Sequence, residues 1–144
     1  MFDIVVLSGG FDPIHIGHTR MIIAASKLGA EVVVGVNSDQ WLKRKKGYAF
    51  MPWSERAEMA ESIKGVSKAV SFDDSDNSAC DLLRKVRADN PNASIAFANG
   101  GDRTTSNIPE NDVASSLAIS LVWSVGGGKI QSSSELVNKL KEKE

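Results

Sequence analysis

The segment Gly9-Gly10-Phe11-Asp12-Pro13-Ile14-His15-Ile16-Gly17-His18 decides the fold of this chain and its chemistry. It follows a short apolar run, Ile4 to Leu7, and leads into Gly17 to Leu28, whose apolar residues fall on one face of a helix. Glycines between a strand and a helix let backbone amides approach an anion, and the helix N-terminus adds positive potential. The segment therefore predicts a phosphate-binding loop between a strand and a helix.

Two histidines of this segment are candidate functional residues. His15 and His18 lie three residues apart, and Gly17 between them removes a side chain that would obstruct a bulky ligand. On the first turn of a helix, both imidazoles can face the same phosphate group. Two surface or core histidines beside an ordinary glycine turn are the alternative, but the position between a Gly-Gly turn and a helix start favours function.

Strand-like and helix-like segments alternate along the rest of the chain. We expect buried parallel strands at Ile4 to Leu7, Val32 to Val36, Ala69 to Phe72, Ile95 to Ala98 and Ile119 to Trp123. We expect helices at Gly17 to Leu28, from Pro52 and Ser54 onward, and at Ser78 to Ala88, Pro109 to Leu117 and Ser132 to Glu144. We expect the longest irregular stretches at Asn37 to Met51, Asp73 to Asn77 and Asn99 to Asn107. The alternation predicts an α/β fold, a Rossmann-like three-layer sandwich with a five-stranded parallel sheet, in one domain over residues 1–144.

The composition excludes several classes of protein. Apolar residues make up 42% and charged residues 24%, as in soluble globular proteins. The net charge of -1 lacks the positive field of a nucleic-acid-binding protein. Cys80 is the single cysteine, so it offers neither an internal disulfide nor a metal-binding spacing. No apolar run is long enough to span a membrane, and no basic leader precedes Ile4, so we expect a soluble cytoplasmic protein.

The pattern G-x-F-D-x-x-H-x-G-H resembles the signature of the cytidylyltransferase-like nucleotidyltransferase superfamily. That superfamily includes the glycerol-3-phosphate, choline-phosphate and ethanolamine-phosphate cytidylyltransferases and the heptose-phosphate adenylyltransferases. The resemblance implies that His15 and His18 are catalytic and stabilise the phosphates in transfer. Class I aminoacyl-tRNA synthetases share the His-Ile-Gly-His signature, but they also need room for tRNA and an amino acid, which 144 residues do not favour.

Three following segments resemble family elements in the family's order. Gly35-Val36-Asn37-Ser38-Asp39 resembles the Val-x-Ser-Asp element near the acceptor, which implies that Asp39 binds the acceptor. Lys43-Arg44-Lys45-Lys46-Gly47 resembles a lysine-glycine segment whose lysine meets phosphate, and Glu55-Arg56 resembles a Glu-Arg that begins a helix. The resemblance implies that Lys46 and Arg56 clamp the acceptor and the triphosphate. For Lys43 and Arg44 we expect a solvated loop.

The remaining similarities lie in the second half of the chain. Gly100-Gly101-Asp102-Arg103 resembles the Gly-Gly-Asp of heptose-phosphate adenylyltransferases, and Ser132 to Ser134 stand where the family places hydroxyls that hold the triphosphate. One segment departs from the pattern: Gly126-Gly127-Gly128-Lys129 replaces the Arg-Thr of the glycerol-phosphate and choline-phosphate enzymes. Either Lys129 takes over the role of that arginine or the role is vacant.

The resemblance implies transfer of a nucleotidyl group from a nucleoside triphosphate to a small phosphorylated acceptor such as glycerol 3-phosphate, with release of pyrophosphate. It implies Mg²⁺ bound with the nucleotide and a homodimer. CTP is favoured, and ATP with a sugar phosphate is the alternative. A non-catalytic nucleotide sensor is the rival from another class, while a dinucleotide-binding module is disfavoured because the first loop lacks G-x-G-x-x-G. The implied nucleotide-binding residues are Gly9, Gly10, Phe11, Asp12, Gly17, Gly101, Asp102, Arg103, Ser132, Ser133 and Ser134.

Overall fold

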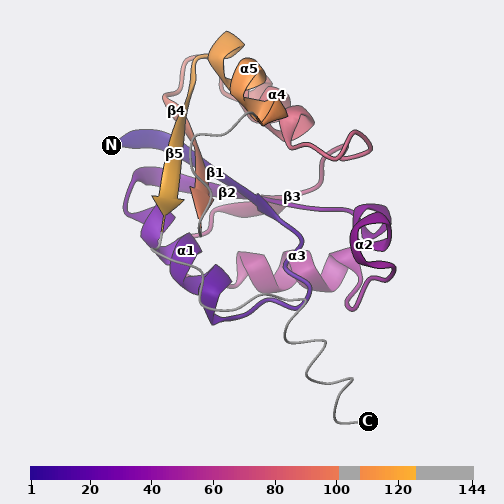
Figure 1. Ribbon diagram of the computed structural model, residues 1–144. Helices are drawn as coiled ribbons and strands as arrows, with labels where there is room; N and C mark the ends of the chain where they lie inside the picture. The colour runs from indigo at the N-terminus through magenta and orange to yellow at the C-terminus, as the bar shows by residue number, and fades with distance from the viewer. Residues whose placement is uncertain (101–107, 126–144) are drawn as a thin grey trace.

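The computed structural model describes residues 1–100 and 108–125, which form a parallel sheet flanked by helices (Figure 1). The strands are β1 (Phe2–Gly9), β2 (Gly29–Val36), β3 (Lys68–Val70), β4 (Ile95–Gly100) and β5 (Ile119–Val125). The helices are α1 (Ile16–Ser26), α2 (Asp39–Lys46), α3 (Trp53–Glu61), α4 (Cys80–Asp89) and α5 (Pro109–Ser116). The strand order is β3-β2-β1-β4-β5, and every pair is parallel. The predicted α/β fold with a five-stranded parallel sheet is confirmed.

The sheet is buried on both faces, which explains the unbroken apolar runs of its strands. Ile4 and Val6 of β1 point into a cluster with residues of α4 and α5. The alternate residues Val5 and Leu7 point into a second cluster with Ile22 of α1 and with residues of α3. Helices therefore cover the sheet from both sides, and the expected three-layer sandwich is present.

The carboxyl ends of the strands meet at one edge of the sheet, where the loops of interest lie. From β1 the chain first builds outward to β2 and β3, and it then returns to place β4 on the other side of β1. The order of the strands thus reverses between β1 and β4. In open parallel sheets, ligands bind at the carboxyl ends of the strands beside such a reversal. The first loop, which directly follows β1, lies at this position.

One prediction about local structure is wrong, because the stretch from Asn37 to Met51 is not irregular throughout. It contains helix α2, which begins after Ser38 and ends before Gly47. The Ser38 side chain caps the helix by accepting the backbone N–H of Trp41 at 3.0 Å. Gly47 ends the helix with a φ of 86°, a left-handed conformation that glycine adopts without a steric penalty. The basic run thus lies on a capped helix.

The predicted C-terminal helix, Ser132 to Glu144, lies outside the described residues. None of the helices that the structure does describe is long and apolar enough to cross a membrane.

Candidate active site

The first loop makes a compact turn between β1 and α1. Phe11 has a φ of 52°, which a non-glycine residue rarely adopts, and its buried ring contacts His18 edge-on with 4.9 Å between ring centroids. A Cβ atom on Gly10 would lie 2.9 Å from a methyl carbon of Leu42 in α2. A side chain at this position would require Leu42 to shift, so the loop packs closely against α2. A backbone outlier that the surroundings hold in place is typical of functional loops.

The two histidines are fixed relative to each other by the start of helix α1. His15 is the N-cap residue, and its Nδ1 accepts the backbone N–H of Gly17 at 3.1 Å. Nδ1 of His18 accepts the backbone N–H of His15 at 3.2 Å, which completes a capping box. The rings stack with 3.9 Å between their centroids. Because both Nδ1 atoms accept hydrogen bonds, the neutral rings carry their protons on Nε2.

The protonation state of His18 follows from its surroundings. Burial, and then the charge of the neighbouring His15, lower the pKa of His18 from 6.5 to about 3. At neutral pH, His18 is therefore an uncharged ring with an Nε2–H donor. An anion bound beside this pair would favour the protonated form of its imidazoles.

Asp12 holds the loop that follows α2 against the first loop. Its buried carboxylate accepts the backbone N–H groups of Phe50 and Met51, each at 2.6 Å. Lys46, at the end of α2, donates to the backbone carbonyl of Asp12 at 2.6 Å and lies 3.4 Å from its carboxylate. Lys46 thus lies beside the first loop, where a phosphate-binding lysine is expected. The carboxylate oxygens of Asp12 are engaged by these backbone donors, and its expected contact with the nucleotide stays a prediction.

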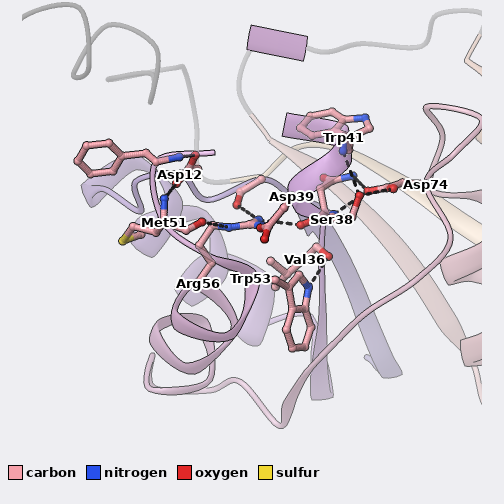
Figure 2. A network of polar contacts seen from close by, with 12 residues as sticks. Asp12, Val36, Ser38, Asp39, Trp41, Met51, Trp53, Arg56 and Asp74 are labelled. Atoms are coloured by element: carbon pink, nitrogen blue, oxygen red, sulfur yellow. Dashed lines mark hydrogen bonds and ion pairs between the residues drawn. The ribbon is translucent and has the colours of Figure 1, made fainter. Parts of the chain in front are cut away.

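Arg56 lies at the centre of a buried polar network (Figure 2). Its side chain is 0% exposed. Nε donates to the carbonyl of Met51 at 2.9 Å, while Nη1 donates to the carbonyls of Gly10 at 2.8 Å and Asn37 at 2.7 Å. Nη2 lies 2.6 Å from a carboxylate oxygen of Asp39. Arg56 therefore joins the loops after β1, β2 and α2, and its expected contact with the acceptor and the triphosphate stays a prediction.

Asp74, which the sequence patterns did not single out, holds the start of helix α2. Asp74 is 4% exposed and comes from the loop between β3 and α4. Its carboxylate accepts the side-chain amide of Asn37 at 3.1 Å, and the backbone N–H and the hydroxyl of Ser38 at 2.7 Å each. The hydroxyl of Ser38 is the cap of α2, so Asp74 orients the helix on which Asp39 and Lys46 lie. The sequence indicates this contact only indirectly, through the Ser38-Asp39 pair after one strand and the acidic stretch from Asp73 to Asn77 after another.

Arg44 of α2 also bonds to the loop that carries Asp74. Its guanidinium donates to the backbone carbonyl of Asp74 at 2.8 Å and to the side-chain oxygen of Asn77 at 3.2 Å and 3.3 Å. Arg44 thus links α2 to the loop after β3 while its side chain stays exposed, as does that of Lys43, and both residues lie on a helix instead of in the expected loop.

The structure brings together the candidates that lie in its described part. His15, His18 and Lys46 lie at the first loop. Asp39 is connected to this loop by Arg56, which bonds both the Asp39 carboxylate and the carbonyl of Gly10. The other candidates lie outside the described residues: Gly101, Asp102, Arg103, Lys129, Ser132, Ser133 and Ser134. Within residues 1–100 and 108–125 no group of three or more His, Cys, Asp or Glu side chains is arranged to hold a metal ion.

Comparison with known proteins identifies related sequences. The chain is 32% identical over 113 residues to the bifunctional protein HldE of Nitratiruptor sp., a match that covers 77% of this chain and 23% of that protein. It is 37% identical over 67 residues to the ethanolamine-phosphate cytidylyltransferase of Arabidopsis thaliana, covering 46% of this chain and 16% of the relative. The chain thus spans less than a quarter of the length of these relatives.

Among solved structures, the fold is similar to a bifunctional NMN adenylyltransferase/ADP ribose pyrophosphatase from Francisella tularensis. The TM-score is 0.72 at 22% identity, with 100% of this chain and 43% of that chain covered. The family model described as cytidylyltransferase-like matches residues 6–124, which include the first loop, α2 and Arg56. With this match over most of its length, the chain belongs to the cytidylyltransferase-like nucleotidyltransferases.

Proposed function

We propose that the chain is a nucleotidylyltransferase that transfers a nucleotidyl group from a nucleoside triphosphate to a small phosphorylated acceptor and releases pyrophosphate. One observation carries the proposal: the stacked rings of His15 and His18 stand at the N-terminus of α1, beside the strand reversal, with the cation of Lys46 at the same loop. Donors and positive potential thus converge at the edge of the sheet where parallel folds bind ligands.

In the proposed reaction, an oxygen of the acceptor's phosphate attacks the α-phosphorus of the triphosphate. A new P–O bond forms, and the bond from the α-phosphorus to the oxygen that bridges it to the β-phosphate breaks. Pyrophosphate leaves with the electron pair of that bond. The attacking oxygen is already anionic, so no base has to remove a proton and no side chain has to form a covalent intermediate. Catalysis is then alignment and stabilisation of charge.

The histidines supply that stabilisation in the proposal. Their Nε2–H groups donate to phosphoryl oxygens whose negative charge grows as the bridging bond breaks, and the N-terminus of α1 adds its dipole. The capping box fixes both rings before the substrate arrives, so little reorganisation is needed during the reaction. Lys46 adds a positive charge within reach of the first loop.

Arg56 and Asp12 act on the substrates through other residues in this proposal. Arg56 holds the carbonyl of Gly10 and the carboxylate of Asp39 in fixed positions, while Asp12 holds the segment after α2. We propose Asp39 as an acceptor-binding residue, because its side chain remains 34% exposed beside Arg56.

The remaining roles rest on the resemblance to the family. We propose that Gly101, Asp102 and Arg103 bind the nucleotide and that Ser132 to Ser134 bind the β- and γ-phosphates. We propose Mg²⁺ as part of the substrate, bound by phosphate oxygens and water, because Mg²⁺ commonly reaches such sites with the nucleotide.

CTP is the first candidate nucleotide, since the region from Asn37 to Arg56 resembles the cytidylyltransferases most. ATP is the second candidate, because Gly100-Gly101-Asp102 and the Gly-Gly-Gly-Lys segment before Ser132 fit an adenylyltransferase at least as well. A base pocket that matches one ring edge leaves buried polar groups unpaired with the other base, so we expect a clear preference.

A pyrophosphate-release assay tests the proposal. CTP and ATP are each combined, in Mg²⁺, with glycerol 3-phosphate, a sugar phosphate, phosphocholine and phosphoethanolamine. We expect release that depends on one acceptor and one nucleotide, and that is lost in the His15→Ala, His18→Ala double variant. Nucleotide binding without release for any acceptor would favour the nucleotide sensor.

A further inference from the structure

A cavity of about 200 Å³ opens at the carboxyl ends of β2 and β3, beside the network around Arg56. Ser38, Asp39 and Gln40 border it from the end of β2, and Ser71 and Phe72 border it from the end of β3. Val36 and Trp53 complete the described lining, and Figure 2 shows the Trp53 indole next to Val36. The indole N–H donates to the carbonyl of Val36 at 3.0 Å, which fixes the ring at the cavity wall.

The cavity is close to the first loop but lies on the other side of β1 from the strand reversal. Gly9, the last residue of β1, pairs with Val36 at the cavity, and neighbouring strands are about 4.8 Å apart. Arg56 also bonds both Gly10 and the cavity residue Asp39. The nucleotide is expected beside β1 and β4. The cavity is therefore placed for a second substrate whose phosphate reaches the first loop.

The charges of the lining limit what the cavity binds. Among its described residues none is a cation, so an anionic group inside it would lack a counter-charge. Asp39 is the single charged residue of this set, and the buried guanidinium of Arg56 already balances its carboxylate at 2.6 Å. An ammonium group would therefore gain little from Asp39, because the guanidinium already neutralises that carboxylate.

The polar atoms of the lining suit hydroxyl groups instead. Ser38, Gln40 and Ser71 supply donors and acceptors, and Asp39 supplies carboxylate oxygens. Trp53, Phe72 and Val36 supply apolar surface for the C–H groups of the same ligand. The volume corresponds to roughly seven water molecules. Such a space suits the hydroxylated carbons of glycerol or of one sugar ring.

We propose that this cavity binds the uncharged, polyhydroxylated part of the acceptor, so that the acceptor is a polyol phosphate or a sugar phosphate and not a phosphorylated amine. The inference rests on the proposed function. Trp53 and Asp39 are then the residues that select the acceptor, while the histidines of the first loop act on its phosphate.

The first test observes binding in the unmodified full chain and does not need turnover. The chain has three tryptophans, and their indole N–H signals are separate probes in a ¹⁵N-¹H spectrum; Trp53→Phe assigns the signal of Trp53. With glycerol 3-phosphate, or with a sugar phosphate, we expect the Trp53 signal to shift and the Trp123 signal to stay. A shift of Trp53 with phosphocholine that is as large or larger would overturn the proposal.

The second test uses pyrophosphate release, with Trp53→Leu as the variant. We expect a KM for the polyol phosphate that is raised at least about tenfold, equivalent to about 1.4 kcal/mol, with an unchanged dissociation constant for the nucleotide. Trp123→Leu, in the strand at the opposite edge of the sheet, is the matched control and should leave the KM within about twofold.

The outcomes separate this inference from the function on which it rests. Release that is fastest with phosphocholine or phosphoethanolamine, or an unchanged KM in Trp53→Leu, would refute the polyol pocket and leave the nucleotidylyltransferase intact. Absence of release with every acceptor would refute both.

Discussion

Replacement of Arg56 by methionine tests the buried network that joins the loops of the site. The substitution keeps much of the side-chain length but removes every donor, so three backbone carbonyls and the carboxylate of Asp39 lose their partner. Removing one partner of a buried charge pair costs about 3–5 kcal/mol. Asp39 keeps 34% of its side chain exposed and is partly screened by water, so we expect the lower end, about 3 kcal/mol.

Urea unfolding, followed by circular dichroism, measures this loss. With a slope of about 2 kcal/mol per molar urea, the midpoint should fall by roughly 1.5 M. The variant should still fold in buffer, because domains of this kind are stable by about 5–15 kcal/mol. Arg84→Met is the control, since Arg84 is exposed on α4, and its midpoint should change by less than about 0.3 M. A shift in Arg56→Met no larger than that of the control would refute the structural role assigned to Arg56.

Four further predictions follow from the site. His15→Ala and His18→Ala should each lower turnover by at least about 100-fold in a folded protein, and near-normal turnover would remove the histidines from the mechanism. Lys46→Ala should lower kcat/KM far more than Lys43→Ala. Equal effects would indicate that the basic residues 43–46 act only through their combined positive charge. The free energy of unfolding should fall as the pH is lowered from about 6.5 toward 3, because the unfolded state protonates His18 and the folded state does not; His18→Gln should flatten this dependence in urea titrations at pH 7 and 4.5. Light scattering at micromolar concentration should give the mass of a homodimer, and a monomer mass would refute that expectation.

The fold was predictable because its signals are local. The central strands are buried on both faces, and their residues therefore form apolar runs in the sequence, as in Ile4 to Leu7. The position of the first loop between a strand and a helix was predictable for the same reason, since the strand, the Gly-Gly turn and the two histidines are contiguous in the sequence. Helix α2 was missed although Ser38 and Gly47 are ordinary caps, because the basic run between them has few apolar residues to reveal a helical period.

The hydrogen bonds and ion pairs that connect the loops of the site were not predictable from the sequence, because they join segments that lie far apart in the chain. Asp74 bonds Ser38 across 36 positions, and Arg56 bonds Gly10 across 46. The role expected for Arg56 came from the family resemblance, and because arginine is usually exposed, nothing in the sequence indicated that it is buried and bonded to backbone carbonyls. The family resemblance implied a place for Arg56 among the site residues, but its burial and its bonding partners come only from the folded chain.

The most direct test of the central claim is ³¹P NMR of the full chain with CTP, Mg²⁺ and glycerol 3-phosphate, with ATP and a sugar phosphate as parallel samples. We expect two products to grow together, pyrophosphate and a nucleoside diphosphate ester of the acceptor, and both to be absent with the His15→Ala, His18→Ala double variant. Growth of a nucleoside monophosphate and pyrophosphate at the same rate without an acceptor, or no phosphorus product in any sample, would contradict nucleotidyl transfer at the first loop.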